Sequence, residues 1–419
     1  MQTTIDYLRR QLFRTFNLVE TMAILAVTIL AVGQASPLIG AQSKTGRQPT
    51  ASTPPAGQQA GGLKDAGVEI DFDNIARKIT AALAGKTAGY GFAVFHNGQL
   101  QKHGAGGYAK RSPDKQPGHE IPFTEYSRIE IASSTKTVTA IGVLRALESK
   151  GKTDAELIYT YLPTTWNIPN SVKGLTFREV LSHHSGLKKV SDGTYDGVRK
   201  SIEAGVSPGY EEGTGDYQNI NYALCRVLLP YIVAAPQMKA SEGDPKAAAI
   251  LTAQTFAHFV RDNVFKPAGV SQLIQFQPWD ESNNLDNLAL LYNYKATDVP
   301  GMLPSIDPPE KAGFGPGGLF INAVELAQIV SALENDKLLA LKTRLMMKQH
   351  ELGIFRYKET AYWSHNGGFG DSKGRGSSTR LVACPNNIQV VILINSGGNA
   401  CANTFDIVKD AVDSSVSKP

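Results

Sequence analysis

The chain has 419 residues, of which 42% are hydrophobic and 19% charged, the composition of a globular protein with room for one large domain or two ordinary ones. Its 42 Lys and Arg residues exceed its 38 Asp and Glu residues by only four, and they are scattered along the chain. This balance lacks the basic stripe of a nucleic-acid-binding protein, so no nucleic-acid partner is expected.

Residues 1–35 are predicted to be an export signal. A segment with three arginines precedes an apolar run over residues 22–32, which is too short to span a bilayer comfortably, and the small residues Gly33 and Ala35 follow it. The alternative is a buried N-terminal helix. We expect an exported protein, periplasmic or secreted, without a stable membrane span.

Residues 36–65 consist mainly of Gly, Pro, Ser, Thr, Gln and Ala. Such a segment buries too little apolar surface to offset the entropy lost on ordering, so it predicts a flexible linker. The folded domain is then residues 66–419. It opens with residues 88–95 and 100–108, which are typical of two strands joined by an Asn-Gly turn.

Residues 131–151 predict a helix, because apolar residues recur at every third position. Ser133 and Lys136 share a face of this helix, and their side-chain tips can meet. A lysine shielded from water can be neutral and accept the serine proton. The same Ser-x-x-Lys spacing occurs at Ser415 and Lys418 in the polar tail, so the pattern alone is also explained by a capped helix with a solvated lysine.

A second short helix is predicted at residues 175–181, with Thr176 as its cap, and it is followed by His183 and His184. Adjacent residues on a helix point about 100 degrees apart, and no third ligand accompanies them. We therefore expect structural histidines rather than a metal site. No metal or cofactor is expected.

The stretch of about 153–300 is predicted to be a mostly helical lobe. Within it, Tyr217 lies two residues before Asn219 at the start of a helix. A phenol there can transfer protons and an amide can orient a substrate. On its own, this pair is equally typical of a surface tyrosine beside a capping asparagine, and that interpretation is favoured.

Beyond residue 300 the pattern returns to strands. A Gly-rich segment at 315–321 leads into a helix that Asn322 is predicted to cap. Residues 362–368 resemble a strand edge where glycine lets a ligand approach the backbone. Residues 378–383 and 388–394 predict two further strands, and a helix follows at 402–412. Strands at both ends of the chain with helices between them predict an α+β fold, an antiparallel sheet formed from both ends with an inserted helical lobe.

The chain contains two other patterns that bear on its chemistry. Ser372 lies in a Gly-x-Ser-x-Gly motif, but the apolar strand and the helix that such a nucleophile elbow requires are missing. Cys225, Cys384 and Cys401 form neither a metal pattern nor a disulfide framework. In an oxidising compartment Cys384 and Cys401 remain candidates for a pair, whereas Cys225 is expected to be a buried free thiol.

Five motifs occur in the order and spacing of a known family. They lie at residues 132–140, 181–187, 208–219, 317–319 and 365–368. Together they resemble the serine β-lactamase and penicillin-binding-protein-like superfamily, in particular its branch of class C β-lactamases, D-specific peptidases and β-lactamase-like carboxylesterases. The resemblance covers residues 75–412.

The resemblance implies three catalytic residues. Ser133 would be the acylated nucleophile, Lys136 its base, and Tyr217 the group that relays protons to the leaving group and activates water.

It also implies a set of substrate-binding residues. Asn219 would hold a substrate amide or order the Lys136 amine. The backbone N–H groups of Ser133 and Gly368 would form an oxyanion hole, and His365 would line the opposite wall. Gly367 would be a further substrate-binding residue.

The chain departs from the family at His365, where β-lactamases of this branch usually carry the lysine of Lys-Thr-Gly. Histidine is largely neutral near pH 7, so efficient β-lactamase action is not expected. The sequence predicts an exported serine hydrolase that cleaves an amide or ester in a small-molecule or peptide substrate: a D-amino-acid peptide, a small ester or a β-lactam. The alternative is a non-catalytic protein whose pocket binds cell-wall peptide or a protein partner.

Overall fold

The computed structural model describes residues 68–417 apart from 212–213, 271–274, 277–287 and 305–313. The predicted export signal and linker lie outside the described residues. The described part belongs to one compact unit, Gly61–Pro419. None of its helices combines the length and apolar character needed to cross a membrane.

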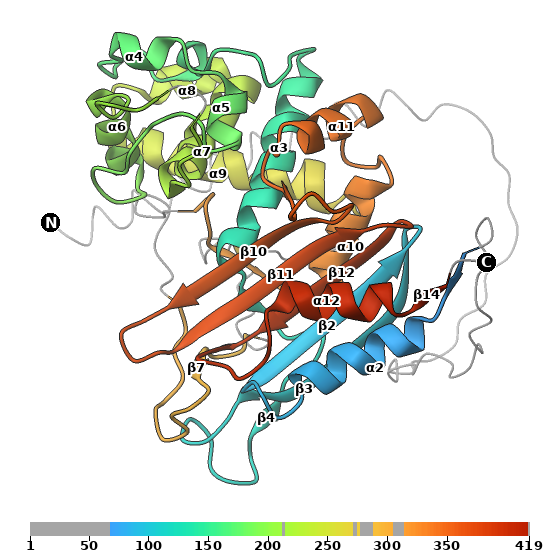
Figure 1. The fold of residues 1–419 in the computed structure, drawn as a ribbon. Coiled ribbons are helices and arrows are strands. Elements are labelled where there is room, and N and C mark those ends of the chain that lie inside the picture. The colour runs from blue at the N-terminus through green and yellow to red at the C-terminus, as the bar shows by residue number, and fades with distance from the viewer. Residues whose placement is uncertain (1–67, 212–213, 271–274, 277–287, 305–313, 418–419) are drawn as a thin grey trace, which may run out of the picture. The chain divides into compact units, whose positions relative to one another are not determined.

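The centre of this unit is an antiparallel sheet built from both ends of the chain (Figure 1). Its five main strands run in the order β10-β11-β12-β2-β3, with each neighbouring pair antiparallel. Their bounds are Gly89–His96 for β2, Gln99–Lys110 for β3, Trp363–Gly370 for β10, Gly376–Cys384 for β11 and Ile388–Ile394 for β12. The α+β prediction is therefore confirmed, as is the tight turn at Asn97 and Gly98, both of which have positive φ angles as a two-residue hairpin requires.

Short strands complete the sheets. β4 (Ile121–Pro122), β7 (Tyr292–Asn293), β9 (Phe355–Arg356) and β13 (Ser396–Gly397) extend the main sheet. β5 (Ile129–Glu130), β8 (Leu319–Ile321) and β6 (Gln275–Phe276) form a separate three-stranded sheet, and β1 (Glu69–Ile70) pairs with β14 (Val416–Ser417).

Helices cover both faces of the main sheet, and as a result its central strand β12 is buried on both sides. All seven of its residues are buried, because successive side chains point to opposite faces and both faces are packed. Val390, Ile392 and Ile394 pack in the core shared with α2 (Phe72–Leu83) and α12 (Thr404–Asp413). Val391 and Leu393 belong to the larger core on the other face.

The larger core also contains α3 (Thr135–Ser149), which lies between the sheet and the helical region (Figure 1). Most of α3 is buried, including the whole of Lys136. The remaining helical segments are η1 (Ala132–Ser134), η2 (Ile158–Tyr161), α4 (Asn170–Lys173), α5 (Phe177–Leu181), α6 (Tyr195–Ala204), α7 (Asn219–Val233), α8 (Ala235–Ser241), α9 (Pro245–Val260), η3 (Arg261–Phe265), α10 (Ala323–Glu334) and α11 (Leu341–Gln349). Between residues 153 and 300 the described chain is mostly helical, and the short strands β6 and β7 there were not expected from the sequence.

Both predicted helix caps are present. The side chains of Thr176 and Asn322 each accept a hydrogen bond from the backbone N–H three residues on, and the carboxylates of Glu179 and Glu325 each accept one from the backbone N–H of the cap residue. The three cysteines are free thiols, so the candidate pair Cys384 and Cys401 is not formed in this structure.

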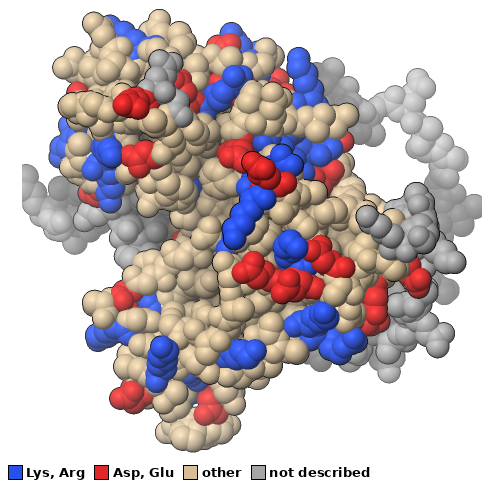
Figure 2. Space-filling model, viewed as in Figure 1, with Lys and Arg blue, Asp and Glu red and all other residues tan. Residues whose placement is uncertain are grey.

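Charged side chains of both signs lie side by side on the face drawn in Figure 2. No stripe of a single sign crosses that face, which agrees with the small net charge of +4.

Replacing Asn322 by alanine should lower the free energy of unfolding by about 1 kcal/mol, because the first turn of α10 loses its capping acceptor. Lys337→Ala, at an exposed position just beyond the same helix, is the control and should stay within about 0.5 kcal/mol of wild type. Urea unfolding of the three proteins measures both. An equal effect of the two substitutions would contradict the capping role.

Candidate active site

Ser133 and Lys136 lie together where η1 passes into α3. Lys136 Nζ donates a hydrogen bond to Ser133 Oγ at 2.9 Å and a second to the carbonyl oxygen of Pro316, also at 2.9 Å. Lys136 is fully buried, whereas Ser133 keeps partial access to solvent. The residue before the serine, Ala132, has a φ of +48°, a left-handed backbone that is uncommon for a residue with a side chain.

Burial changes the protonation of Lys136. Desolvation lowers its pKa to about 7, although the Glu130 carboxylate acts in the opposite direction. A substantial fraction of the amine is therefore neutral near pH 7. A neutral amine hydrogen-bonded to a serine hydroxyl can accept its proton, which is the arrangement of an activated nucleophile.

Glu130 is a member of this cluster that sequence analysis missed. Its side chain is buried, and Oε1 accepts a hydrogen bond from the Gly318 N–H at 2.7 Å. Burial raises the pKa of Glu130, while the backbone N–H groups of Gly318 and Ala132 and the charge of Lys136 lower it. The sequence shows only an acidic residue three positions before Ser133. That spacing is weak evidence for a role, because the contact of Glu130 with Gly318 depends on the pairing of β5 with β8.

The Gly-rich segment before β8 lies beside Lys136, and the structure shows how it is held. Pairing of β5 with β8 places it beside the start of α3. Thr139 Oγ1 donates to the carbonyl oxygen of Gly315 at 2.8 Å, next to the Pro316 carbonyl that accepts from Lys136. This segment therefore helps to orient the lysine.

Tyr217 lies against Ser133 and Lys136, as the resemblance implied. Lys136 Nζ is 5.0 Å from the centroid of its ring, and the side chain is half-exposed. Burial raises the pKa of the Tyr217 phenol, and a hydrogen bond with Ser133 opposes that shift. The phenol is therefore protonated at neutral pH and adjacent to the serine.

Asn219 begins α7 and is exposed. Among the hydrogen bonds of the described residues, none joins its side chain to Lys136, whose partners are Ser133 and Pro316. Of the two roles that the resemblance gave Asn219, ordering the lysine is thus not seen. Holding a substrate amide stays a prediction.

Strand β10 brings Gly367 into direct contact with η1. A methyl group on Gly367 would lie 2.1 Å from the Ile131 carbonyl oxygen, 2.4 Å from Thr379 Oγ1 and 3.0 Å from the Ser134 nitrogen. Thr379 Oγ1 itself donates to the Ile131 oxygen at 2.9 Å. Only glycine allows this close approach, which sets the position of β10 beside Ser133.

Gly368, by contrast, has open space on its side-chain face. An oxyanion hole needs the backbone N–H of Gly368 near Ser133. Gly367, the preceding residue, contacts η1 closely, and Gly368 therefore lies near that helix as well. The oxyanion role stays a prediction.

His365 is also on β10 and is almost fully buried. Its Nδ1 lies 2.7 Å from the Asn366 carbonyl oxygen, so Nδ1 carries the proton and donates. Burial, together with the nearby Lys136 charge, lowers the pKa of His365 to about 3. The ring is therefore neutral at pH 7 and supplies no positive charge to the wall of the site.

His183 is a buried histidine whose ring packs inside the site. Its ring stacks on the ring of Tyr217, with centroids 4.3 Å apart and planes inclined by 29°. His184 does differ, since its Nδ1 bonds to Ser182 instead. Within the described residues there is no group of three or more His, Cys, Asp and Glu side chains that could hold a metal ion.

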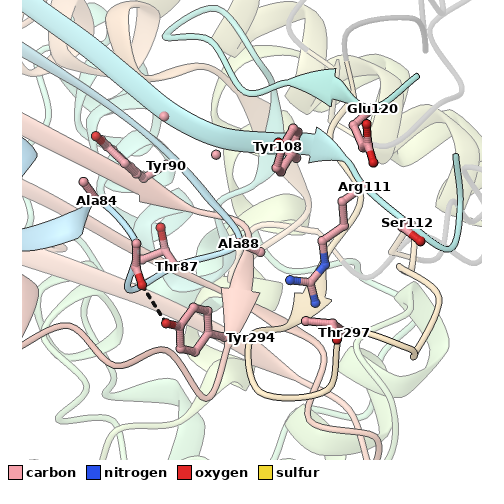
Figure 3. A pocket seen from close by; sticks show the side chains of 13 residues that line it. Ala84, Thr87, Ala88, Tyr90, Tyr108, Arg111, Ser112, Glu120, Tyr294 and Thr297 are labelled. Atoms are coloured by element: carbon pink, nitrogen blue, oxygen red, sulfur yellow. Dashed lines mark hydrogen bonds between the residues drawn. The ribbon is translucent and has the colours of Figure 1, made fainter. Parts of the chain in front are cut away.

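A separate cavity of about 620 Å³ lies at the end of β2 and β3, and Figure 3 shows its side chains. Tyr90, Tyr108, Arg111 and Glu120 line it, and Tyr294 closes one side by donating to the Gly85 carbonyl oxygen at 2.7 Å. It shares no lining residue with the Ser133 cluster. Ser372 is exposed in the loop between β10 and β11, outside both.

Three comparisons with known proteins bear on this arrangement. The Beta-lactamase family model matches residues 74–236. Penicillin-binding protein 4* from Bacillus subtilis (strain 168) is 25% identical over 220 residues, which are 49% of this chain and 42% of that protein, so the chain spans less than half the length of this relative.

Two solved structures share the fold. D-amino acid amidase from Ochrobactrum anthropi SV3 has a TM-score of 0.60 at 18% identity, covering 82% of this chain and 99% of its own. EstCE1, described as a hydrolase with promiscuous acyltransferase activity, has a TM-score of 0.59 at 17% identity, covering 81% and 98%.

Residues 74–236 thus match the Beta-lactamase family model, and the α+β fold with its buried Ser-x-x-Lys pair agrees with the resemblance to the serine β-lactamase and penicillin-binding-protein-like superfamily.

The pKa of Lys136 predicts how reactivity at Ser133 depends on pH. The rate of labelling by a fluorophosphonate should rise as the pH increases through about 7 and then level off, because only the neutral amine accepts the serine proton. Glu130→Gln should move this rise to lower pH, because the carboxylate that raises the lysine pKa is removed. A rate that does not change between pH 5 and 9 would contradict the role of the amine.

The two glycines of β10 form a matched pair for a stability test. Gly367→Ala should lower the free energy of unfolding by about 1–3 kcal/mol and slow the labelling of Ser133, because the methyl group forces β10 away from η1. Gly368→Ala meets open space and should change stability by less than about 0.5 kcal/mol. Thermal unfolding compares them, and equal destabilisation would show that the close approach is not what requires glycine.

Proposed function

We propose that this protein is an exported serine hydrolase that cleaves an amide or ester through an acyl-enzyme at Ser133. The observation that carries the proposal is the 2.9 Å contact between Ser133 Oγ and the amine of a fully buried lysine. Desolvating an amine is costly, and a non-catalytic binding pocket would have no need of it. Export is supported only by the basic and apolar pattern of residues 1–35.

In the proposed acylation step, neutral Lys136 takes the proton of the Ser133 hydroxyl as Oγ attacks the substrate carbonyl carbon. The negative charge that develops on the carbonyl oxygen is stabilised by the backbone N–H groups of Ser133 and Gly368. Removing one such donor typically costs on the order of 10²–10³ in rate. The C–N or C–O bond then breaks, and Tyr217 passes a proton to the leaving group.

In the proposed deacylation step, the same proton-transfer groups act on water instead of on Ser133. A water molecule gives its proton to the Tyr217–Lys136 pair and attacks the ester carbonyl, and the bond to Ser133 Oγ breaks as the serine regains a proton. The contact of Lys136 with both Ser133 and the Tyr217 ring supports one shared proton-transfer group for the two steps.

The neutral state of His365 narrows the proposed substrate. A wall residue that stays uncharged at pH 7 cannot pair with the carboxylate of a β-lactam or of a peptide C-terminus. We therefore favour substrates without a carboxylate at that position, such as D-amino-acid amides and small esters. The names of the two structural neighbours, an amidase and a hydrolase with acyltransferase activity, are consistent with this class.

The test is turnover of p-nitrophenyl butyrate, D-alanyl p-nitroanilide and nitrocefin by the purified full-length protein. Ser133→Ala should abolish turnover and fluorophosphonate labelling, and Tyr217→Phe should reduce turnover. Ser372→Ala, in the exposed Gly-x-Ser-x-Gly segment, is the matched serine control and should retain both. The ester or the anilide should be preferred to nitrocefin.

A wild-type protein that neither turns over any of the three substrates nor takes the label would reject the hydrolase proposal. The non-catalytic binding role would then be the better explanation.

A further inference from the structure

His183 lies in the site, but the proposed mechanism gives it no task. Its side chain is 3% exposed and its backbone has a φ of +63°, a left-handed conformation that is unfavourable for a residue with a side chain. This turn after α5 directs the residue toward the segment that carries Tyr217. The carbonyl oxygen of His183 accepts from the Asp216 N–H at 2.8 Å. Strain retained at such a point suggests a functional reason.

Hydrogen bonds determine which ring nitrogen of His183 carries the proton. Nδ1 is 3.2 Å from the backbone nitrogen of Gln218, which can only donate, and 3.2 Å from Asn221 Nδ2. Nδ1 is therefore an unprotonated acceptor, and the proton is on Nε2. Nε2 is buried and has no hydrogen-bond partner among the described residues.

The orientation of the Asn221 amide is itself determined. Ser185 Oγ donates to Asn221 Oδ1 at 2.5 Å and accepts from the Leu187 N–H at 3.2 Å. The amide nitrogen of Asn221 must then face His183. A chain of donors that begins in the backbone after α5 thus ends at Nδ1 and keeps the imidazole neutral.

This neutral ring is the surface on which Tyr217 packs. The two rings are stacked at 4.3 Å, and the bond from Gln218 anchors the backbone of the residue that follows the tyrosine. On its other sides the imidazole faces Tyr222 at 5.2 Å and Phe355 at 6.3 Å. Because Tyr217 is half-exposed, the imidazole is a main support for the orientation of its phenol.

We propose that His183 is a positioning residue for Tyr217: Gln218 and Asn221 hold it as a neutral imidazole with its proton on Nε2, and its ring keeps the phenol beside Ser133 and Lys136. The inference rests on the proposed acyl-serine mechanism and adds a residue to it. A protonated His183 ring would place a second positive charge next to Lys136. This charge would oppose protonation of the lysine during the proposed acylation step.

The experiment measures kcat for p-nitrophenyl butyrate in the full-length protein. His183→Phe keeps an aromatic ring but loses the Nδ1 acceptor, and Asn221→Ala keeps the imidazole but loses one of its donors. Each should lower kcat, with His183→Phe costing on the order of 10²-fold, as expected for a displaced proton-transfer group. His184→Phe is the neighbouring control and should leave kcat unchanged, since the hydrogen bonds of the His184 side chain go to Ser182.

Combining His183→Phe with Tyr217→Phe in a double variant distinguishes positioning of Tyr217 by His183 from a general structural role of His183. If His183 acts through Tyr217, its substitution should have almost no further effect on kcat once the phenol is absent. Fluorophosphonate labelling of Ser133, which does not require the phenol to protonate a leaving group, should stay close to wild type in His183→Phe. Long-range ¹H–¹⁵N NMR should show His183 with an unprotonated Nδ1.

Three results would overturn the inference: an unchanged kcat in both single variants, the same fold-loss with and without the Tyr217 hydroxyl, or a protonated Nδ1. These differ from failure of the proposed function, in which the wild type shows no Ser133-dependent turnover at all. Should His183→Phe not fold, Asn221→Ala and the wild-type NMR spectrum decide the question.

Discussion

The burial of the Lys136 amine is the constraint on which the rest of the site depends. An ammonium ion in an apolar interior is unfavourable, so the pKa falls to about 7 and the amine becomes a competent base at neutral pH. The residues around Lys136 therefore have to supply hydrogen-bond partners for a neutral amine, not a counter-charge for a permanent cation. Ser133 Oγ and the Pro316 carbonyl oxygen do this directly, and buried Glu130 limits how far the pKa falls.

The partners of that amine come from distant parts of the chain. β8 delivers the Gly-rich segment by pairing with β5, and β10 approaches η1 through Gly367. Thr379 on β11 bonds to the same Ile131 oxygen that Gly367 approaches. The main antiparallel sheet and the separate β5-β8-β6 sheet therefore assemble the surroundings of Ser133 together.

Two neutral histidines face this cluster with opposite hydrogen-bonding character. His365 carries its proton on Nδ1, because the Asn366 carbonyl accepts from it, whereas His183 carries its proton on Nε2, because Gln218 and Asn221 donate to Nδ1. Both rings have a pKa of about 3, which burial and the nearby lysine cause. Among the described residues, Lys136 is thus the group of this cluster that titrates near neutral pH.

The sequence by itself determined the α+β fold, the helix caps and the pairing of Ser133 with Lys136, because each depends on residues close together in the chain or on hydrophobic period. The tertiary structure alone decided the contact of Glu130 with the Gly-rich segment, the packing of His183 on Tyr217, and which ring nitrogen of His365 carries its proton. These properties depend on which distant segments surround a side chain and how much water they exclude. A local sequence pattern does not show how deeply a side chain will be buried. In this site, burial determines the protonation of the lysine and histidine side chains and the hydrogen bonds that they make.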